Sequence, residues 1–122
     1  DHTFSDIWSY YDDDFQTCYQ NIINDMETYK DVKGPKGKEG QPSNFFCISC
    51  VPWMDFTGYS TWVPTGRPNL FPIITLGKYV EEEGRRRLSA ALTISHASAD
   101  GYHASMFFER LQEVLDEFVI DQ

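Results

Sequence analysis

Long apolar runs are missing from this sequence, and so is an excess of basic residues. No stretch approaches the roughly 18 consecutive apolar residues that a membrane-spanning helix needs, so we expect no association with the membrane. Only 10 residues are lysine or arginine against 19 aspartates and glutamates, and the formal net charge is −9. Because an acidic surface repels phosphate backbones, we expect no nucleic acid among the partners.

Cysteine is also scarce, with an odd count of 3. An odd count does not suggest a disulfide framework, and it suits a cytoplasmic protein. Cys47 and Cys50 have the spacing of a metal or redox motif, but they lie in the apolar segment Asn44–Val51, which is typical of a strand. Residues three apart in a strand point to opposite faces, so these thiols cannot converge. We expect buried, chemically inert cysteines.

The sequence has neither an initiator methionine nor a leader pattern at Asp1, so we expect further residues upstream. Its 122 residues, 41% of them hydrophobic and 16% aromatic, provide enough apolar side chains for a core. These values predict one globular domain.

The hydrophobic pattern predicts two helices and three strands. Apolar residues recur every three or four positions from Ser5 to about Tyr29, where Ser5 is suited to cap a helix and Asp6 to complement its dipole. A loop rich in glycine and proline follows. The remaining expected elements are strands at 44–51, 71–80 and 86–95 and a helix at about 102–120. This order favours an α+β fold, with the helices on one face of a mixed or antiparallel sheet.

A candidate catalytic residue, His96, lies between the last strand and the last helix. Histidine can take up and return a proton near neutral pH, and corners between elements often expose reactive groups. A second feature is the basic cluster of Lys78 with Arg85, Arg86 and Arg87 on the expected hairpin. It would suit an anionic cofactor or a merely solvated turn, and the sequence leaves both open.

Four motifs in order along the chain carry a family resemblance. His96-x-x-x-Asp100-Gly101 is the signature of the CoA-dependent acyltransferases. Around it the chain is similar to the chloramphenicol acetyltransferases in order and spacing, over nearly its whole length. The matching segments are Thr3-Phe4-Ser5, Ser49-x-x-Pro52-Trp53-x-x-Phe56-Thr57, Pro72-Ile73-Ile74-Thr75-x-Gly77-Lys78-Tyr79 and His96-Ala97-x-x-Asp100-Gly101-Tyr102-His103.

The resemblance implies an O-acetyltransferase that moves an acetyl group from acetyl-CoA to a hydroxyl of chloramphenicol, without a metal, and so gives antibiotic resistance. It implies the carboxyl-terminal portion of one acyltransferase domain, a two-layer sandwich that assembles as a homotrimer with active sites between subunits. His96 would be the general base and Ser49 the donor to the oxyanion, and Asp100 would support the corner by pairing with an upstream arginine. Further matches are Phe4 and Thr75 on the substrate side and Trp53, Lys78 and Tyr79 on the cofactor side.

Two positions depart from the family pattern, since Ser95 stands where a second histidine is usual and Cys47 where a polar residue is common. The nearest alternative is a dihydrolipoamide acyltransferase, which shares the corner motif. A non-catalytic trimeric interaction module is another. A helical reading of 95–103 would instead place His96, Asp100 and His103 on one face as metal ligands, but Gly101 opposes it. A serine hydrolase lacks its Gly-x-Ser-x-Gly elbow here.

Overall fold

The computed structural model describes residues 5–58, 71–95 and 99–118. The predicted site residues Phe4 and His96 therefore lie outside the described residues. The chain divides into two compact units, 1–43 and 44–122.

The first unit contains one helix, α1, at Phe15–Thr28. Its amino-terminal cap is Asp14, whose carboxylate accepts hydrogen bonds from the amide and hydroxyl of Thr17 at 3.0 and 2.7 Å. The expected start at Ser5 was wrong by ten residues. The segment after Ser5 is extended instead, because the amide of Asp6 donates to the carbonyl of Pro35 and its carbonyl accepts from the amide of Gly37.

The loop predicted at 31–43 is confirmed, since its described residues contain no helix and only an isolated bridge between Asp6 and Lys36. Gly37 is buried at the crossing, and a Cβ there would lie 2.7 Å from Oγ of Ser5. Nearby, the carboxylate of Asp25 accepts from the Ser9 hydroxyl at 2.6 Å and from the Lys38 ammonium at 2.9 Å. These contacts hold the loop and the extended segment to α1.

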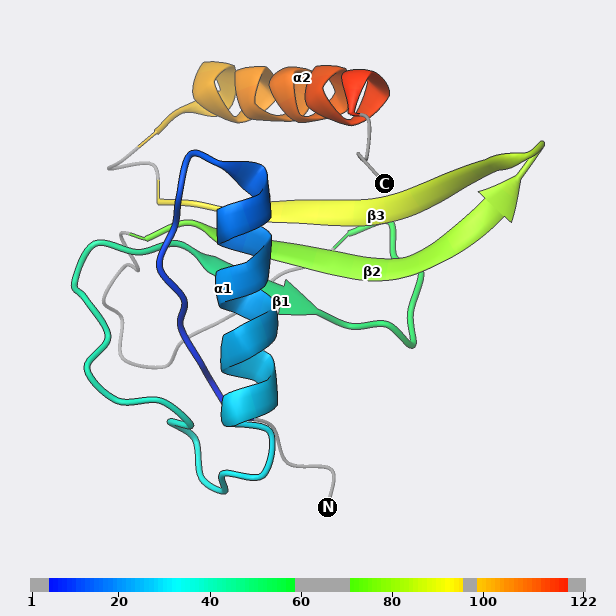
Figure 1. Cartoon of the computed structure of the whole chain (residues 1–122). Coiled ribbons are helices and arrows are strands. Elements are labelled where there is room, and N and C mark those ends of the chain that lie inside the picture. The colour runs from blue at the N-terminus through cyan, green and yellow to red at the C-terminus, as the bar shows by residue number, and fades with distance from the viewer. Residues whose placement is uncertain (1–4, 59–70, 96–98, 119–122) are drawn as a thin grey trace. The chain divides into compact units, whose positions relative to one another are not determined.

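The second unit contains a mixed sheet of order β1-β2-β3, with strands Cys47–Cys50, Ile73–Glu82 and Arg85–Thr93. β1 pairs with β2 in parallel, and β2 pairs with β3 in an antiparallel hairpin, the long twisted ribbon of Figure 1. The predicted hairpin is confirmed. Its turn is only Glu83-Gly84, with φ of 51° and 78°, the left-handed pair that two-residue hairpins favour. Helix α2, at Gly101–Glu117, follows.

Two helices and a mixed sheet confirm the α+β class. The described residues include no buried hydrophobic side chain, however, and the one buried polar residue is Thr75. The prediction of buried thiols was also wrong. Cys47 is half-buried and Cys50 is exposed, because β1 is an edge strand whose alternate residues face outward, and Cys18 on α1 is half-buried as well. None of the helices within the described residues is long and apolar enough to cross a membrane.

Candidate functional site

Two of the predicted site residues, Ser49 and Thr75, are brought together by the sheet. They are register partners on the parallel strands β1 and β2, and Thr75 in turn opposes Ala91 of β3. Side chains of register partners share one face of a sheet. The two hydroxyls, 26 positions apart in sequence, therefore belong to the same row across the three strands.

The hydroxyl of Thr75 is an unusual group in this row. The residue is 1% exposed, and its Oγ1 has no hydrogen-bond partner among the described residues. A buried hydroxyl without a partner costs about 1 to 3 kcal/mol, so such groups normally meet a water, a ligand or another chain. In this row the Thr75 side chain is flanked by Ser49 on one side and by the small residue Ala91 on the other.

The corner that carries His96 begins where β3 ends at Thr93, and α2 begins at Gly101. The predicted order of a strand followed by a helix on the two sides of this corner is confirmed. The placement of His96 itself lies outside the described residues, so the metal alternative with Asp100 and His103 stays untested. Among the described residues no group of three or more histidines, cysteines or acidic residues could hold a metal ion.

Asp100 caps α2. Its carboxylate accepts from the amide of His103 at 3.1 Å, while the His103 ring lies against the amide of Asp100 in a capping box. The hydrogen bond from the His103 amide is the main cause of a pKa below the ordinary value for Asp100. The expected arginine partner is not tested by this contact. Asp100 nevertheless has an architectural task at the corner, as its position predicts.

The predicted cofactor residues Lys78 and Tyr79 border one groove of about 470 Å³, together with Cys50, Pro52 and Leu88. Consecutive residues of a strand normally face opposite ways. The register of the hairpin shifts between Leu76 and Tyr79, and such a bulge re-aims side chains. The groove therefore combines an apolar floor, a phenol ring and an ammonium group, which suits a ligand with an apolar arm and a phosphate.

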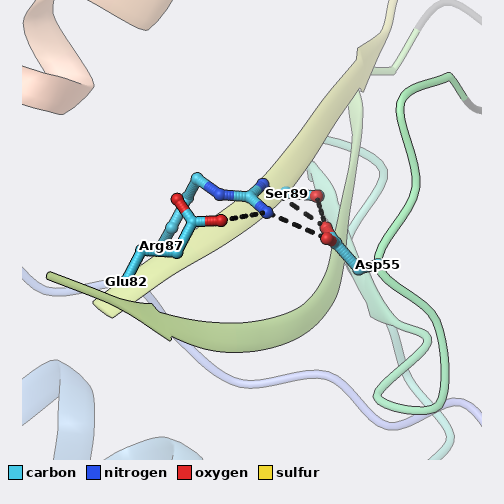
Figure 2. Close-up of polar contacts among 4 residues, drawn as sticks. All are labelled: Asp55, Glu82, Arg87 and Ser89. Atoms are coloured by element: carbon cyan, nitrogen blue, oxygen red, sulfur yellow. Dashed lines mark hydrogen bonds and ion pairs between the residues drawn. The ribbon is translucent and has the colours of Figure 1, made fainter. Parts of the chain in front are cut away.

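Trp53 is 81% exposed on the turn that follows β1. Asp55, two residues further on, accepts from the Ser89 hydroxyl at 2.5 Å and from the Arg87 guanidinium at 2.9 Å. Figure 2 shows these contacts with Glu82, which lies 3.5 Å from Arg87. The hydrogen bond from Ser89, followed by that from Arg87, lowers the pKa of Asp55. Sequence reasoning missed this cluster, because 32 positions separate Asp55 from Arg87 and no local motif links them.

A separate apolar cavity of about 310 Å³ lies at the corner, between the sheet and the first turns of α2. Its lining includes Ile74, Leu92 and Ile94 from the sheet side and His103 and Phe107 from α2. Ile74 and Leu92 lie on the opposite face of the sheet from Ser49 and Thr75, since strand side chains alternate. The apolar cavity and the row of Ser49 and Thr75 therefore belong to different faces of the sheet.

Comparisons with known proteins agree with this arrangement. The family model described as chloramphenicol acetyltransferase matches residues 1–112. A chloramphenicol acetyltransferase of Clostridium perfringens is 38% identical over 95% of this chain and 53% of its own length. One of Bacillus pumilus is 39% identical over 98% of the chain and 56% of its own length.

A solved chloramphenicol acetyltransferase structure matches 84% of this chain and 50% of its own, with 25% identity and a TM-score of 0.61. The chain thus spans about half the length of the relatives it matches. These matches favour the antibiotic-modifying enzymes over the dihydrolipoamide acyltransferases. Sequence motifs, sheet topology and relatives lead to one conclusion: this chain belongs to the chloramphenicol acetyltransferase family.

Proposed function

We propose that this chain takes part in O-acetylation of chloramphenicol by acetyl-CoA and so gives resistance to the antibiotic. The family membership supports the reaction class. The observation that carries the proposal is the row of Ser49 and Thr75 on neighbouring strands. The buried hydroxyl of Thr75 has no hydrogen-bond partner among the described residues. A reaction that develops negative charge on an oxygen uses hydroxyl donors held rigidly in this way.

In the proposed mechanism, His96 removes the proton of the acceptor hydroxyl, and the oxygen attacks the thioester carbonyl. Ser49 donates a hydrogen bond to the oxyanion, and Thr75 positions a water beside the intermediate. Attack forms the new C–O bond and gives a tetrahedral intermediate, whose collapse breaks the C–S bond while the proton passes from the imidazolium to the thiolate of CoA. Phe4 contributes to the acceptor pocket, and Asp100 holds the corner by capping α2.

The cofactor is assigned to the groove of Pro52, Lys78 and Tyr79, and Trp53 follows Pro52 on the turn after β1. The aromatic rings would stack on the adenine or contact the pantetheine arm, and the ammonium of Lys78 would meet a phosphate. We further propose that the chain supplies one portion of a two-layer acyltransferase domain in the cytoplasm. The complete enzyme would be a homotrimer with its active sites between subunits.

The experiment is an assay of acetyl-CoA consumption by the full-length gene product, with chloramphenicol compared against a panel of other alcohols. Chloramphenicol should be the preferred acceptor. A preference for a different alcohol would replace the substrate and keep the reaction class, whereas no turnover with any acceptor would refute the function.

Two substitutions test the roles. His96→Ala should abolish acetyl transfer, whereas His103→Ala should weaken the cap of α2 and leave turnover measurable. Ser49→Ala should lower kcat by about 10²-fold with little change in KM, because an oxyanion donor acts in the transition state. Ser105→Ala, on the exposed side of α2, is its matched control. Retention of the parent rate by His96→Ala would remove it as the base.

A further inference from the structure

The turn that carries Trp53 is fixed by several backbone hydrogen bonds, although the Trp53 side chain itself is exposed. The amide of Met54 donates to the carbonyl of Val51 and closes the turn, and the amide of Val51 donates to Leu76 of β2 at 2.8 Å. The amide of Lys78 then donates to the carbonyl of Met54 at 2.7 Å. Fixing each backbone residue costs about 1 to 2 kcal/mol of entropy, yet the Trp53 ring gains little burial in return.

A close backbone approach adds to this anchoring. A Cβ at Gly77 would lie 2.7 Å from the carbonyl oxygen of Met54 and 2.9 Å from the ring of Phe56. Only glycine therefore lets the segment after the turn lie directly on the bulge of β2. The same bulge presents Lys78 and Tyr79 to the groove, so the turn and the groove share one backbone junction.

Asp55 ties this junction to β3. Its carboxylate accepts from Ser89 and from Arg87, both on the far strand of the hairpin, while Arg87 also approaches Glu82 of β2 (Figure 2). An arginine fork on a carboxylate is geometrically specific, which makes it suited to fix direction as well as distance. Asp55 thus connects the segment after Trp53 to the hairpin by charge-assisted hydrogen bonds.

These contacts also divide the basic cluster into two groups. Arg87 is occupied by Asp55 and Glu82, and Arg86 lies 3.4 Å from Glu81 and over the Tyr79 ring at 5.6 Å. Lys78 makes no ion pair within the described part of the chain, and it borders the groove. Lys78 is therefore the cation of the groove that can pair with an anionic ligand, whereas Arg87 pairs with Asp55 and Glu82 within the protein.

We propose that Asp55, held by Ser89 and Arg87, is a positioning residue that fixes the Trp53 turn beside the Lys78–Tyr79 groove for a nucleotide-bearing thioester. This inference rests on the proposed function, because it assigns Trp53 to the cofactor. The backbone that carries the ring is held before the cofactor arrives, so binding does not have to fix the turn. Loss of Asp55 should weaken cofactor binding while the reacting groups remain in place.

The test uses Asp55→Ala, Ser89→Ala and Arg87→Lys in the full-length gene product. Asp55→Ala should raise KM for acetyl-CoA about tenfold, equivalent to ~1.4 kcal/mol, with kcat changed less than about twofold. Ser89→Ala should have a smaller effect of the same kind, and Arg87→Lys should retain part of the affinity by keeping the charge. Glu113→Gln breaks a comparable surface pair with Arg110 on α2 and should change neither constant.

A second readout does not depend on catalysis. With every other tryptophan of the full-length gene product, Trp8 and Trp62 included, replaced by Phe, the fluorescence anisotropy of Trp53 reports the order of its turn, and it should fall in Asp55→Ala without cofactor. Unchanged anisotropy, or an unchanged KM, would overturn the positioning role. If Asp55→Ala does not fold, Ser89→Ala decides the same comparison. Calorimetry that detects no CoA binding by the parent would refute the proposed function, and the anisotropy would still report on the turn by itself.

Discussion

Each unit of this protein has one carboxylate that accepts from a serine hydroxyl and from a cation, and the two differ in burial. The side chains of Asp25 and Lys38 in the first unit are 18% and 15% exposed, whereas those of Asp55 and Arg87 in the second are 35% and 48% exposed. Each unit also has a buried glycine where a distant segment crosses, Gly37 in one and Gly77 in the other.

Asp25 and Asp55 make similar hydrogen bonds, but because their exposure differs, the consequences of these hydrogen bonds differ as well. Burial raises the pKa of Asp25, but the hydrogen bonds from Ser9 and Lys38 outweigh it and the net pKa is lowered. For Asp55 the hydrogen bonds from Ser89 and Arg87 are the two largest influences on the pKa, and both lower it. A desolvated pair is costly to break, whereas solvent screens an exposed one. We therefore expect the cluster around Asp25 to contribute mainly to the free energy of unfolding. The cluster around Asp55 should act mainly by fixing the orientation of the segment after Trp53.

The largest effect should come from Asp25→Ala, because it leaves the Lys38 ammonium mostly buried without its carboxylate. We expect a loss of about 2 to 3 kcal/mol in the free energy of unfolding, below the value for a fully buried pair. Urea denaturation measures it, and faster amide exchange in α1 localises it. Glu27→Gln, which breaks the exposed pair with Lys30, should cost less than about 0.5 kcal/mol. Equal losses in both variants would remove burial as the reason.

The next largest effects on stability should come from substitutions at the two buried glycines, one in each unit. Gly77→Ala should cost about 1 to 2 kcal/mol, because its Cβ would meet the backbone carbonyl of Met54, which cannot rotate away. Gly37→Ala should cost less, since its nearest neighbour is the Ser5 hydroxyl and a side chain can turn aside. Gly58→Ala has open space and is the control. The prediction fails if Gly37→Ala proves the more damaging substitution in thermal melts.

Acid should remove the smaller contribution to stability that each of the two carboxylates makes through its lowered pKa. Both pKa values are lowered in the folded state from 3.8, so the stability they provide is present above that pH and is lost as pH falls through the folded values. Asp25→Asn and Asp55→Asn should therefore each flatten the fall of unfolding free energy below about pH 4. The lowered pKa values of the caps Asp14 and Asp100 persist in both variants as a common background. An acid limb as steep as the parent's in either variant would contradict the contribution assigned to that carboxylate.

The smallest effect belongs to Glu82→Gln. Its carboxylate is 62% exposed and lies 3.5 Å from Arg87, which still keeps Asp55. We expect no change in melting temperature beyond experimental error and no change in Trp53 anisotropy. A measurable fall in anisotropy would show that Glu82, and not only Asp55, fixes the guanidinium.

Local chemistry explains what was predictable. The Glu83-Gly84 turn, the alternation of strand residues and the Asp100 cap are all decided by neighbours within a few positions. The start of α1 was mispredicted because Ile7 and Tyr11 continue the helical spacing, although the segment is held extended by hydrogen bonds to the loop at Pro35 and Gly37. Propensity and periodicity yield to such distant backbone partners.

The sequence by itself determined the family, the order of the elements and the identity of the candidate groups at positions 49, 75, 96 and 100. Short motifs preserve spacing, and spacing is what a linear pattern records. Only the tertiary structure decided that Ser49 and Thr75 share a row, that Gly77 admits the Met54 carbonyl and that Asp55 meets Arg87. Each of these depends on strand register or on a bulge, and a shift of one residue would turn every side chain to the opposite face.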